Sequence, residues 1–305
     1  MRKLHIIEQH RGQIFCSKYV LLVYQMIKDI SSVVNALSID VEEWFDTVLF
    51  SDDAAFGARQ SGLPADVSRI LAMLDGMAVK ATFFILGSVA RKYPDTVKSI
   101  AAAGHEVASH GGTHKSVFRM STAEFKKDLS DSRTALEKLT GKAPLGYRAP
   151  TFSILKNESF YLAAIREAGY SYDSSLYPVF LSRRRRAPYT DASGLMEFPP
   201  SVFSFSGVKF PFLGGTFLRL MPKNFLASRL AGLNSMGLPG ILYCHSWEFG
   251  EIAPAGTGLT KELIQYSNVA SVAKKVNYLA RSFKFSPVRE VLGLSRCPKP
   301  NMGIL

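Results

Sequence analysis

Short apolar runs alternate with amphipathic segments along the 305 residues of this chain. The apolar runs have the length of buried strands, and they span residues 33–39, 81–86, 105–109, 145–148, 170–173 and 240–245. Apolar residues recur at helical spacing over residues 66–77, 94–103, 121–139, 158–168 and 267–282. Ser121 and Glu124 have the spacing of a capping box, and Pro94 stands at the start of its predicted helix. These repeated strand–helix units predict an α/β fold with helices covering a parallel sheet, and the chain length favours a barrel.

The regular pattern weakens over residues 179–239, which are rich in Phe, Pro, Ser and Gly. We interpret this region as loops and short antiparallel strands that belong to the same domain. The sequence therefore predicts a single domain over residues 33–290, with an N-terminal extension (1–32) before it and a tail (291–305) after it.

The composition is that of a globular protein, with 47% hydrophobic and 20% charged residues. Almost all of the net charge of +12 lies in residues 1–35, Arg183–Arg186 and 281–305. A basic surface can attract nucleic acid, an anionic membrane or an acidic polymer. No nucleic-acid motif with matching aromatic residues is present, so we expect no nucleic-acid partner. The arginine run is either a solvated loop or a contact for anionic lipid or acidic glycan.

Cysteine spacing and the N-terminal segment predict a cytoplasmic protein. Cys16, Cys244 and Cys297 are far apart and form no CxxC pair, which fits a reducing compartment. The apolar run Tyr19–Ile30 is interrupted and falls short of the roughly 20 apolar residues of a membrane span. It also lacks the early position and the cleavage site of a signal peptide. A peripheral contact of the N-terminal segment with an anionic membrane surface stays open as an alternative.

Ionisable side chains stand at the carboxyl ends of the predicted strands. His110 and His114, in Ser-His-Gly-Gly-Thr-His, have a spacing that lets two imidazoles converge on one metal ion. The other strand ends add Asp40, Glu42, Arg148, Asp173 and His245. Each of these alone is explained as a structural ion pair or an exposed loop position. Because a parallel barrel forms its active site at this edge, their shared position predicts one site.

Several motifs resemble those of the polysaccharide deacetylase family, also known as the NodB-homology group or carbohydrate esterase family 4. They are Ser-Ile-Asp-Val-Glu, Ser-His-Gly-Gly-Thr-His, Tyr-Arg-Ala-Pro-Thr-Phe, Tyr-Asp-Ser-Ser and Leu-Tyr-Cys-His-Ser-Trp-Glu, in the order of the family. Residues 35–45, Asn-Ala-Leu-Ser-Ile-Asp-Val-Glu-Glu-Trp-Phe, resemble the branch associated with exopolysaccharide loci. The resemblance covers residues 35–290. It implies a distorted (β/α) barrel of the NodB type, in a single domain, and metal-dependent amide hydrolysis.

The resemblance implies a role for each matching residue. Asp40 stands at the position of the catalytic base, and Arg148 matches the arginine that pairs with it. His245 matches the histidine that acts as general acid. Asp173 matches the aspartate that orients this histidine.

The implied metal ligands include one departure from the family pattern. His110 and His114 match the two histidine ligands. The carboxylate ligand of the main branch directly follows the base, where this chain has Val41. Residues i and i+2 of a strand share a face, so we expect Glu42 to serve as the ligand and Glu43 to point away. The donor set implies a divalent metal, with Zn²⁺ as the first choice.

Aromatic residues beside the motifs are candidates for contacts with sugar rings. Trp44 and Trp247 are candidate subsite walls, with core packing as the alternative. Thr151 and Phe152 take the place of the family's third-motif aromatic residue, and we expect them to line the substrate site. Tyr243 replaces the usual leucine of the last motif.

Together these features predict a hydrolase of linear amide carbon–nitrogen bonds. We expect it to remove N-acetyl groups from an amino-sugar polysaccharide or its lipid-linked precursor, in exopolysaccharide biosynthesis. Its partner would then be an N-acetylated glycan. Two alternatives stay open, namely a hydrolase of cyclic amides or imides on the same fold and an inactive glycan-binding module.

Overall fold

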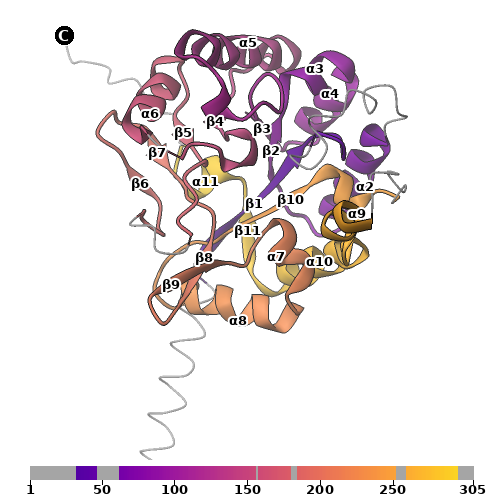
Figure 1. Cartoon of the computed structure of the whole chain (residues 1–305). Helices are drawn as coiled ribbons and strands as arrows, with labels where there is room; N and C mark the ends of the chain where they lie inside the picture. Colours follow the sequence, from indigo (N-terminus) through magenta and orange to yellow (C-terminus); the bar gives the residue numbers. More distant parts are fainter. Residues whose placement is uncertain (1–31, 47–61, 156, 180–183, 252–258, 295–305) are drawn as a thin grey trace, which may run out of the picture.

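The computed structural model describes residues 32–46, 62–155, 157–179, 184–251 and 259–294. A curved, mostly parallel sheet forms a partial barrel, and helices pack around its outside (Figure 1). The predicted α/β barrel class is thus confirmed. Residues 1–31 of the predicted N-terminal extension and residues 295–305 of the predicted tail lie outside the described residues. Every helix among the described residues is either too short or too polar to span a membrane.

The main sheet brings the first and last parts of the chain side by side. Its order is β10 (Ile241–His245), β1 (Val34–Val41), β2 (Thr82–Ile85), β3 (Glu106–Ser109), β4 (Gly146–Tyr147), β5 (Tyr172–Asp173), β7 (Met196–Glu197) and β6 (Tyr189–Thr190). A further strand, β11 (Lys284–Ser286), also pairs with β1. All of these pairs are parallel except β6–β7, so most strands end at one edge of the barrel.

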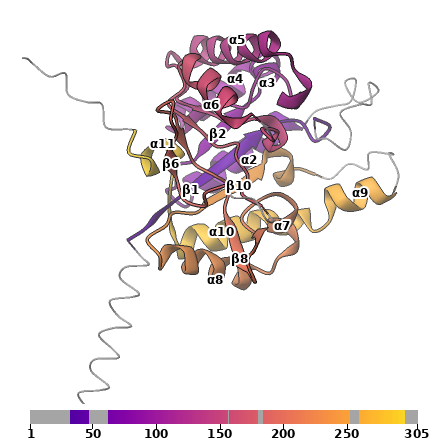
Figure 2. The same cartoon turned by 60° about the vertical axis from the view of Figure 1, so that its left-hand side comes forward.

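Helices connect the strands and most of them cover the outer face of the sheet, whereas the last one packs against the interior cluster through Val288. They are α2 (Leu63–Asp75), α3 (Gly87–Lys92), α4 (Pro94–Ala102), α5 (Thr122–Thr140), α6 (Glu158–Glu167), α7 (Gly215–Leu220), α8 (Lys223–Asn234), α9 (Leu259–Tyr266), α10 (Val272–Ser282) and α11 (Val288–Val291). Short 3₁₀ turns are η2 (Val117–Arg119), η3 (Pro150–Phe152), η4 (Ser246–Phe249) and η5 (Val269–Ser271). Figure 2 shows α3, α4 and α5 on one side of the sheet and α8 and α10 on the other. The predicted capping box of Ser121 and Glu124 is present at the start of α5.

Strand β1 separates two cores by its alternation. Leu37, Ile39 and Val41 face outward and pack in the large apolar cluster under the helices. Ala36 faces the barrel interior, in a smaller cluster that includes Phe84 of β2. The even-numbered positions that follow it toward the carboxyl end of β1 are polar. Val41, which breaks the family pattern, is therefore an ordinary core residue on the outer face.

The region over residues 179–239 is only partly as predicted. It does contain the antiparallel pairs β6–β7 and β8 (Val202–Phe205) with β9 (Val208–Pro211). It also contains α7 and α8, which the sequence pattern does not reveal. Leu226, Leu230 and Leu233 of α8 are buried. Other apolar residues lie around the rest of this helix, so its amphipathic signal is weak.

Candidate active site

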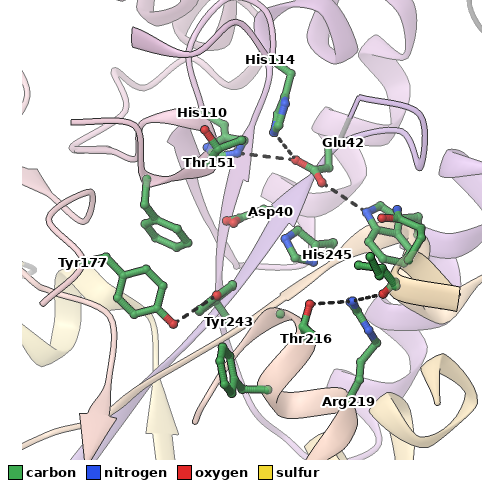
Figure 3. Close-up of a pocket in the computed structure, with 16 residues that line it drawn as sticks. Asp40, Glu42, His110, His114, Thr151, Tyr177, Thr216, Arg219, Tyr243 and His245 are labelled. Carbon is green, nitrogen blue, oxygen red and sulfur yellow. Dashed lines mark hydrogen bonds and ion pairs between the residues drawn. The ribbon is translucent and has the colours of Figure 1, made fainter. Parts of the chain in front are cut away.

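A pocket of about 360 Å³ opens at the carboxyl edge of the barrel. Asp40, Glu42, His110, His114 and His245 line it, each from the end of a strand or the loop after it (Figure 3). The sequence predicted all five. The strand order explains their meeting, because β1 lies between β10 and β2 and β3 follows β2.

Glu42 and the two histidines form a compact cluster of ligand atoms. One oxygen of Glu42, Oε2, lies 2.9 Å from Nε2 of His114 and 3.7 Å from Nε2 of His110. One ligand atom from each of the three residues falls within 4.8 Å of the others. The neighbouring Glu43 does turn away, and its Oε1 accepts a hydrogen bond from the hydroxyl of Tyr93 at 3.0 Å.

The surroundings of this cluster prepare it to hold a metal ion. Nδ1 of His110 lies 2.8 Å from the carbonyl oxygen of Arg148, which fixes the proton on Nδ1 and leaves the Nε2 lone pair toward Glu42. The other oxygen of Glu42 accepts a hydrogen bond from Nε1 of Trp247 at 3.2 Å. Two imidazole nitrogens and one carboxylate, with open positions facing a pocket, are a donor set of catalytic zinc sites. The residues present therefore fit a divalent metal.

Charges within the cluster shift its pKa values in opposite directions. Burial raises the pKa of Glu42, but the charges of His114 and His245 outweigh it and hold the pKa well below its usual value. Burial lowers the pKa of His114, but the Glu42 carboxylate raises it overall. The carboxylate and the imidazole therefore stabilise each other's charged forms, as expected where a negative carboxylate occupies a site that also suits a cation.

Asp40 lies beside this cluster and is held by a buried arginine. Nη1 of Arg148 donates to Oδ1 of Asp40 at 2.7 Å and to Oγ of Ser38 at 3.0 Å, and Nη2 donates to Oγ of Ser174 at 3.0 Å. The Arg148 side chain is fully buried, with its guanidinium 4.0 Å from the centre of the Phe84 ring. The predicted pairing of Asp40 with Arg148 is thus present in the structure. One carboxylate is fixed by charge-assisted hydrogen bonds while it still faces the pocket.

His245 lies beside Asp40 on the adjacent strand. The two residues are register partners on β10 and β1, and the His245 ring stacks on Trp247 at an interplanar angle of 12°. Burial lowers the pKa of His245, but the negative charges of Glu248 and Glu42 raise it to about 9. A protonated imidazole is suited to donate a proton.

In the described part of the structure Asp173 does not contact His245, so the geometry does not support the role expected for Asp173. Asp173 is the register partner of Glu197 on β7 and accepts hydrogen bonds from the backbone and hydroxyl of Ser175. Its neighbour Tyr172 packs in the interior cluster, so alternation turns Asp173 to the outer face. The carboxylate beside His245 belongs instead to Glu248, whose Oε2 lies 3.2 Å from Nδ1 of His245.

The candidate substrate-binding residues divide into two groups. Thr151, Phe152 and Trp247 line the pocket, whereas Trp44 does not. The chain turns after β1, with a hydrogen bond from the Asp46 amide to the Glu43 carbonyl, so strand alternation does not extend to Trp44. Thr151 and Phe152 both have left-handed backbone, with φ of 57° and 53°. Such strain in non-glycine residues gathers at functional sites.

Half of the pocket residues, among them Tyr177, Tyr243, Thr216 and Arg219, were not assigned a site role from the sequence. Tyr177 and Tyr243 form an aromatic wall, with their hydroxyl oxygens 3.5 Å apart. Thr216 and Arg219 reach the pocket from α7, a helix that the sequence pattern does not reveal. For Glu248, which contacts His245 from the turn η4, a signal was present. It stands three residues after His245, at the spacing of a carboxylate that caps a helical turn.

The described members of the arginine run bind protein groups. Arg184 forms an ion pair with Glu158 at 2.7 Å and donates to the carbonyl oxygen of Ile154. Arg185 lies over the ring of Tyr189, and Arg186 donates to a serine hydroxyl. These contacts give the run a structural role. Its predicted contact with anionic lipid or glycan stays a prediction.

Two sequence families match consecutive parts of the chain. Residues 48–172 match the family described as polysaccharide deacetylase, and residues 173–293 match a domain of unknown function, DUF3473. The first match contains His110 and His114 but begins after Asp40 and Glu42. The second contains His245 and Glu248.

Curated relatives match only part of this chain. A peptidoglycan-N-acetylglucosamine deacetylase of Bacillus cereus is 37% identical over 90 residues, which is 30% of this chain and 33% of that protein. A peptidoglycan deacetylase of Helicobacter pylori is 34% identical over 129 residues, 41% of each chain. A chitin deacetylase of Pestalotiopsis is 33% identical over 92 residues, 29% of this chain and 31% of that protein. The aligned region thus spans less than half the length of these relatives.

Solved structures share the fold. A candidate polysaccharide deacetylase from Mycobacterium smegmatis superposes with a TM-score of 0.60 and 24% identity, covering 90% of this chain and 95% of the other. An allantoinase superposes with a TM-score of 0.56 and 17% identity, covering 86% and 89%. At these identities the likeness concerns the fold. Together with the match of residues 48–172 to the polysaccharide deacetylase family, it confirms the predicted resemblance to that family.

Proposed function

We propose that this protein is a metal-dependent hydrolase that removes N-acetyl groups from an amino-sugar polysaccharide or its lipid-linked precursor, in exopolysaccharide biosynthesis. The observation that carries the proposal is the cluster of Glu42, His110 and His114 in one pocket with Asp40 and His245. The names of the relatives, which are deacetylases of peptidoglycan and chitin, support an N-acetylated glycan as substrate.

Glu42, His110 and His114 would hold the metal, with Zn²⁺ as the first choice. A divalent ion at this position would polarise the amide carbonyl and make water acidic enough to attack at neutral pH. The protein's part is to keep the three ligands in place through the Arg148 carbonyl and the Trp247 indole.

The remaining groups of the site would move protons and orient the substrate. Asp40, fixed by Arg148, would accept the proton of the attacking water. His245 would give a proton to the departing sugar nitrogen, because a neutral amine is a better leaving group than the nitrogen anion. A backbone N–H near Thr151 would donate to the developing oxyanion. Acetate and a free amine on the glycan would be the products.

Neighbouring glutamates provide a matched test. Purified wild type, Glu42→Gln and Glu43→Gln proteins are analysed for bound metal and for acetate released from N-acetylglucosamine oligomers. We expect about one divalent ion per chain in the wild type and in Glu43→Gln, and loss of both metal and activity in Glu42→Gln. An active, metal-free wild type, or a Glu43→Gln variant that alone loses its metal, would overturn the proposal.

Two further variants separate metal binding from proton transfer. His110→Ala should lose both the metal and acetate release. Asp40→Asn should keep the metal and lose turnover, because its carboxylate contacts Arg148 and not the ligand cluster. Loss of the metal in Asp40→Asn would make Asp40 a ligand and would contradict its assignment as the base.

The same assay distinguishes the two alternative functions drawn from the sequence. Turnover of a ring amide without acetate release would favour the cyclic amide hydrolase. Glycan binding without turnover would favour the inactive module. The cytoplasmic location and the peripheral membrane contact stay predictions.

A further inference from the structure

We infer that Glu248, clamped by Arg219, is the residue that positions His245 for proton transfer, an inference that rests on the proposed deacetylase function. The structure places this carboxylate against both the backbone and the ring of the histidine. Nothing in the family assignment of residues 173–293 gives either residue a role.

Glu248 contacts His245 twice. Its Oε2 accepts a hydrogen bond from the backbone N–H of His245 at 2.9 Å and lies 3.2 Å from Nδ1 of the ring. The turn η4 follows directly after β10, so the carboxylate folds back over the end of the strand that carries the histidine. A contact at Nδ1 leaves Nε2 as the ring nitrogen available to substrate.

Arg219 holds the other oxygen of this carboxylate. Its Nη1 donates to Oε1 of Glu248 at 2.5 Å, and both side chains are almost fully buried. Its Nη2 donates to the hydroxyl of Thr216 and to the carbonyl oxygen of Ile264. In Figure 3, Arg219 and Thr216 lie below His245, and Glu42 lies above it. A buried, charge-assisted ion pair, whose arginine is itself held by the two acceptors of Nη2, fixes the glutamate in one orientation.

The backbone of Arg219 is itself anchored by the C-terminal part of the chain. Its carbonyl oxygen accepts hydrogen bonds from Nζ of Lys275 at 2.5 Å and from Nδ2 of Asn268 at 2.6 Å. Lys275 also binds the preceding carbonyl, that of Leu218, at 2.9 Å. These contacts tie the end of α7 to α10 and its preceding turn, so the clamp is built from rigid elements.

Glu248 thereby takes the place that the family pattern would give to Asp173. Asp173 lies on the outer face of β5, with Ser175 and Glu197 as its neighbours. Residues 173–293 then contribute side chains to the site in addition to packing against the sheet. They supply the histidine, its positioning carboxylate and the arginine that holds this carboxylate.

The test compares Glu248→Gln with Glu251→Gln, a control three residues along the chain whose side chain is 96% exposed. Bound metal, thermal unfolding, kcat and KM are measured for both, with N-acetylglucosamine oligomers as substrate. We expect Glu248→Gln to lower kcat by about 100-fold with normal metal content and a KM within about twofold. Glu251→Gln should match the wild type. Glu248→Asp, which keeps the charge, should recover part of kcat.

Two additional variants keep the inference open to refutation. Because Glu248→Gln leaves Arg219 buried without its partner, Glu248→Gln/Arg219→Met removes both charges; it should fold, keep the metal and show the same loss of kcat. Asp173→Asn should leave kcat near the wild-type value. Normal kcat in folded Glu248→Gln, or loss of kcat in Asp173→Asn alone, would overturn the inference. A wild type without deacetylase activity would instead refute the proposed function.

Discussion

Lowering the pH should destabilise this protein through His105, a histidine far from the pocket. The side chain is 5% exposed, and its Nδ1 accepts a hydrogen bond from the Ala81 amide at 3.2 Å. Burial, with a smaller effect of Lys80, lowers the pKa of His105 from 6.5 to about 4. A proton on Nδ1 would also remove the acceptor of this hydrogen bond, so the fold favours the neutral ring.

The size of the effect follows from proton linkage. The unfolded chain takes up the proton near pH 6.5, whereas the folded chain resists it until about pH 4. The stabilisation is therefore complete above pH 6.5 and is lost as the pH falls toward 4. The two pKa values predict a loss of about 2 kcal/mol between pH 7.5 and pH 5 from this residue alone.

Urea unfolding of wild type and His105→Asn at pH 7.5 and pH 5 measures this contribution. The asparagine Oδ1 can accept the Ala81 hydrogen bond but does not titrate, so other titrating groups, including the metal ligands, affect both proteins equally. The wild type should lose about 2 kcal/mol more than the variant between the two pH values. An equal loss in both proteins would refute the argument.

Two further predictions concern the neighbourhood of the site. Burial first, and then the charge of Asp173, raises the pKa of Glu197 well above its usual value; the folded state keeps this proton, and stability falls as the pH rises above 4.5. Glu197→Gln should therefore raise the melting temperature more at pH 8.5 than at pH 5.5, and an equal change at both would contradict the raised pKa. At Gly214, a Cβ would lie 1.9 Å from the ring of Tyr243, so Gly214→Ala should cost about 1–3 kcal/mol and raise KM by displacing the pocket wall. Gly232→Ala, where a Cβ meets nothing within 4 Å, is the control, and equal effects of the two would exclude the steric explanation.

Much of the site was predictable because it depends on periodicity. The alternation of β1 alone places Asp40 and Glu42 on one face and Val41 in the core. The shared carboxyl edge of parallel strands then brings these carboxylates to His110 and His245. The sequence therefore sufficed to identify the candidate ligands and the two residues proposed to transfer protons.

The remainder depended on information that local sequence does not carry. The role expected for Asp173 came from the resemblance of its motif, which does not show the direction of the side chain, and strand β5 has only two residues from which to infer it. Arg219 meets Glu248 across a separation of 29 residues, through a helix whose position is set by packing. Trp44 follows a turn, after which alternation no longer predicts direction.

The pairing of β1 with β10 has a consequence for the order of folding. Asp40 of β1 and His245 of β10 are register partners in the sheet, although they lie 205 positions apart in the sequence. During synthesis, β1 leaves the ribosome long before β10 and presents an unpaired edge on that side until β10 arrives, an exposure that favours aggregation. The segment that matches the deacetylase family, residues 48–172, contains neither β1 nor β10, so we expect that it is not an independent folding unit. Any enzymatic activity would report that β10 has paired with β1.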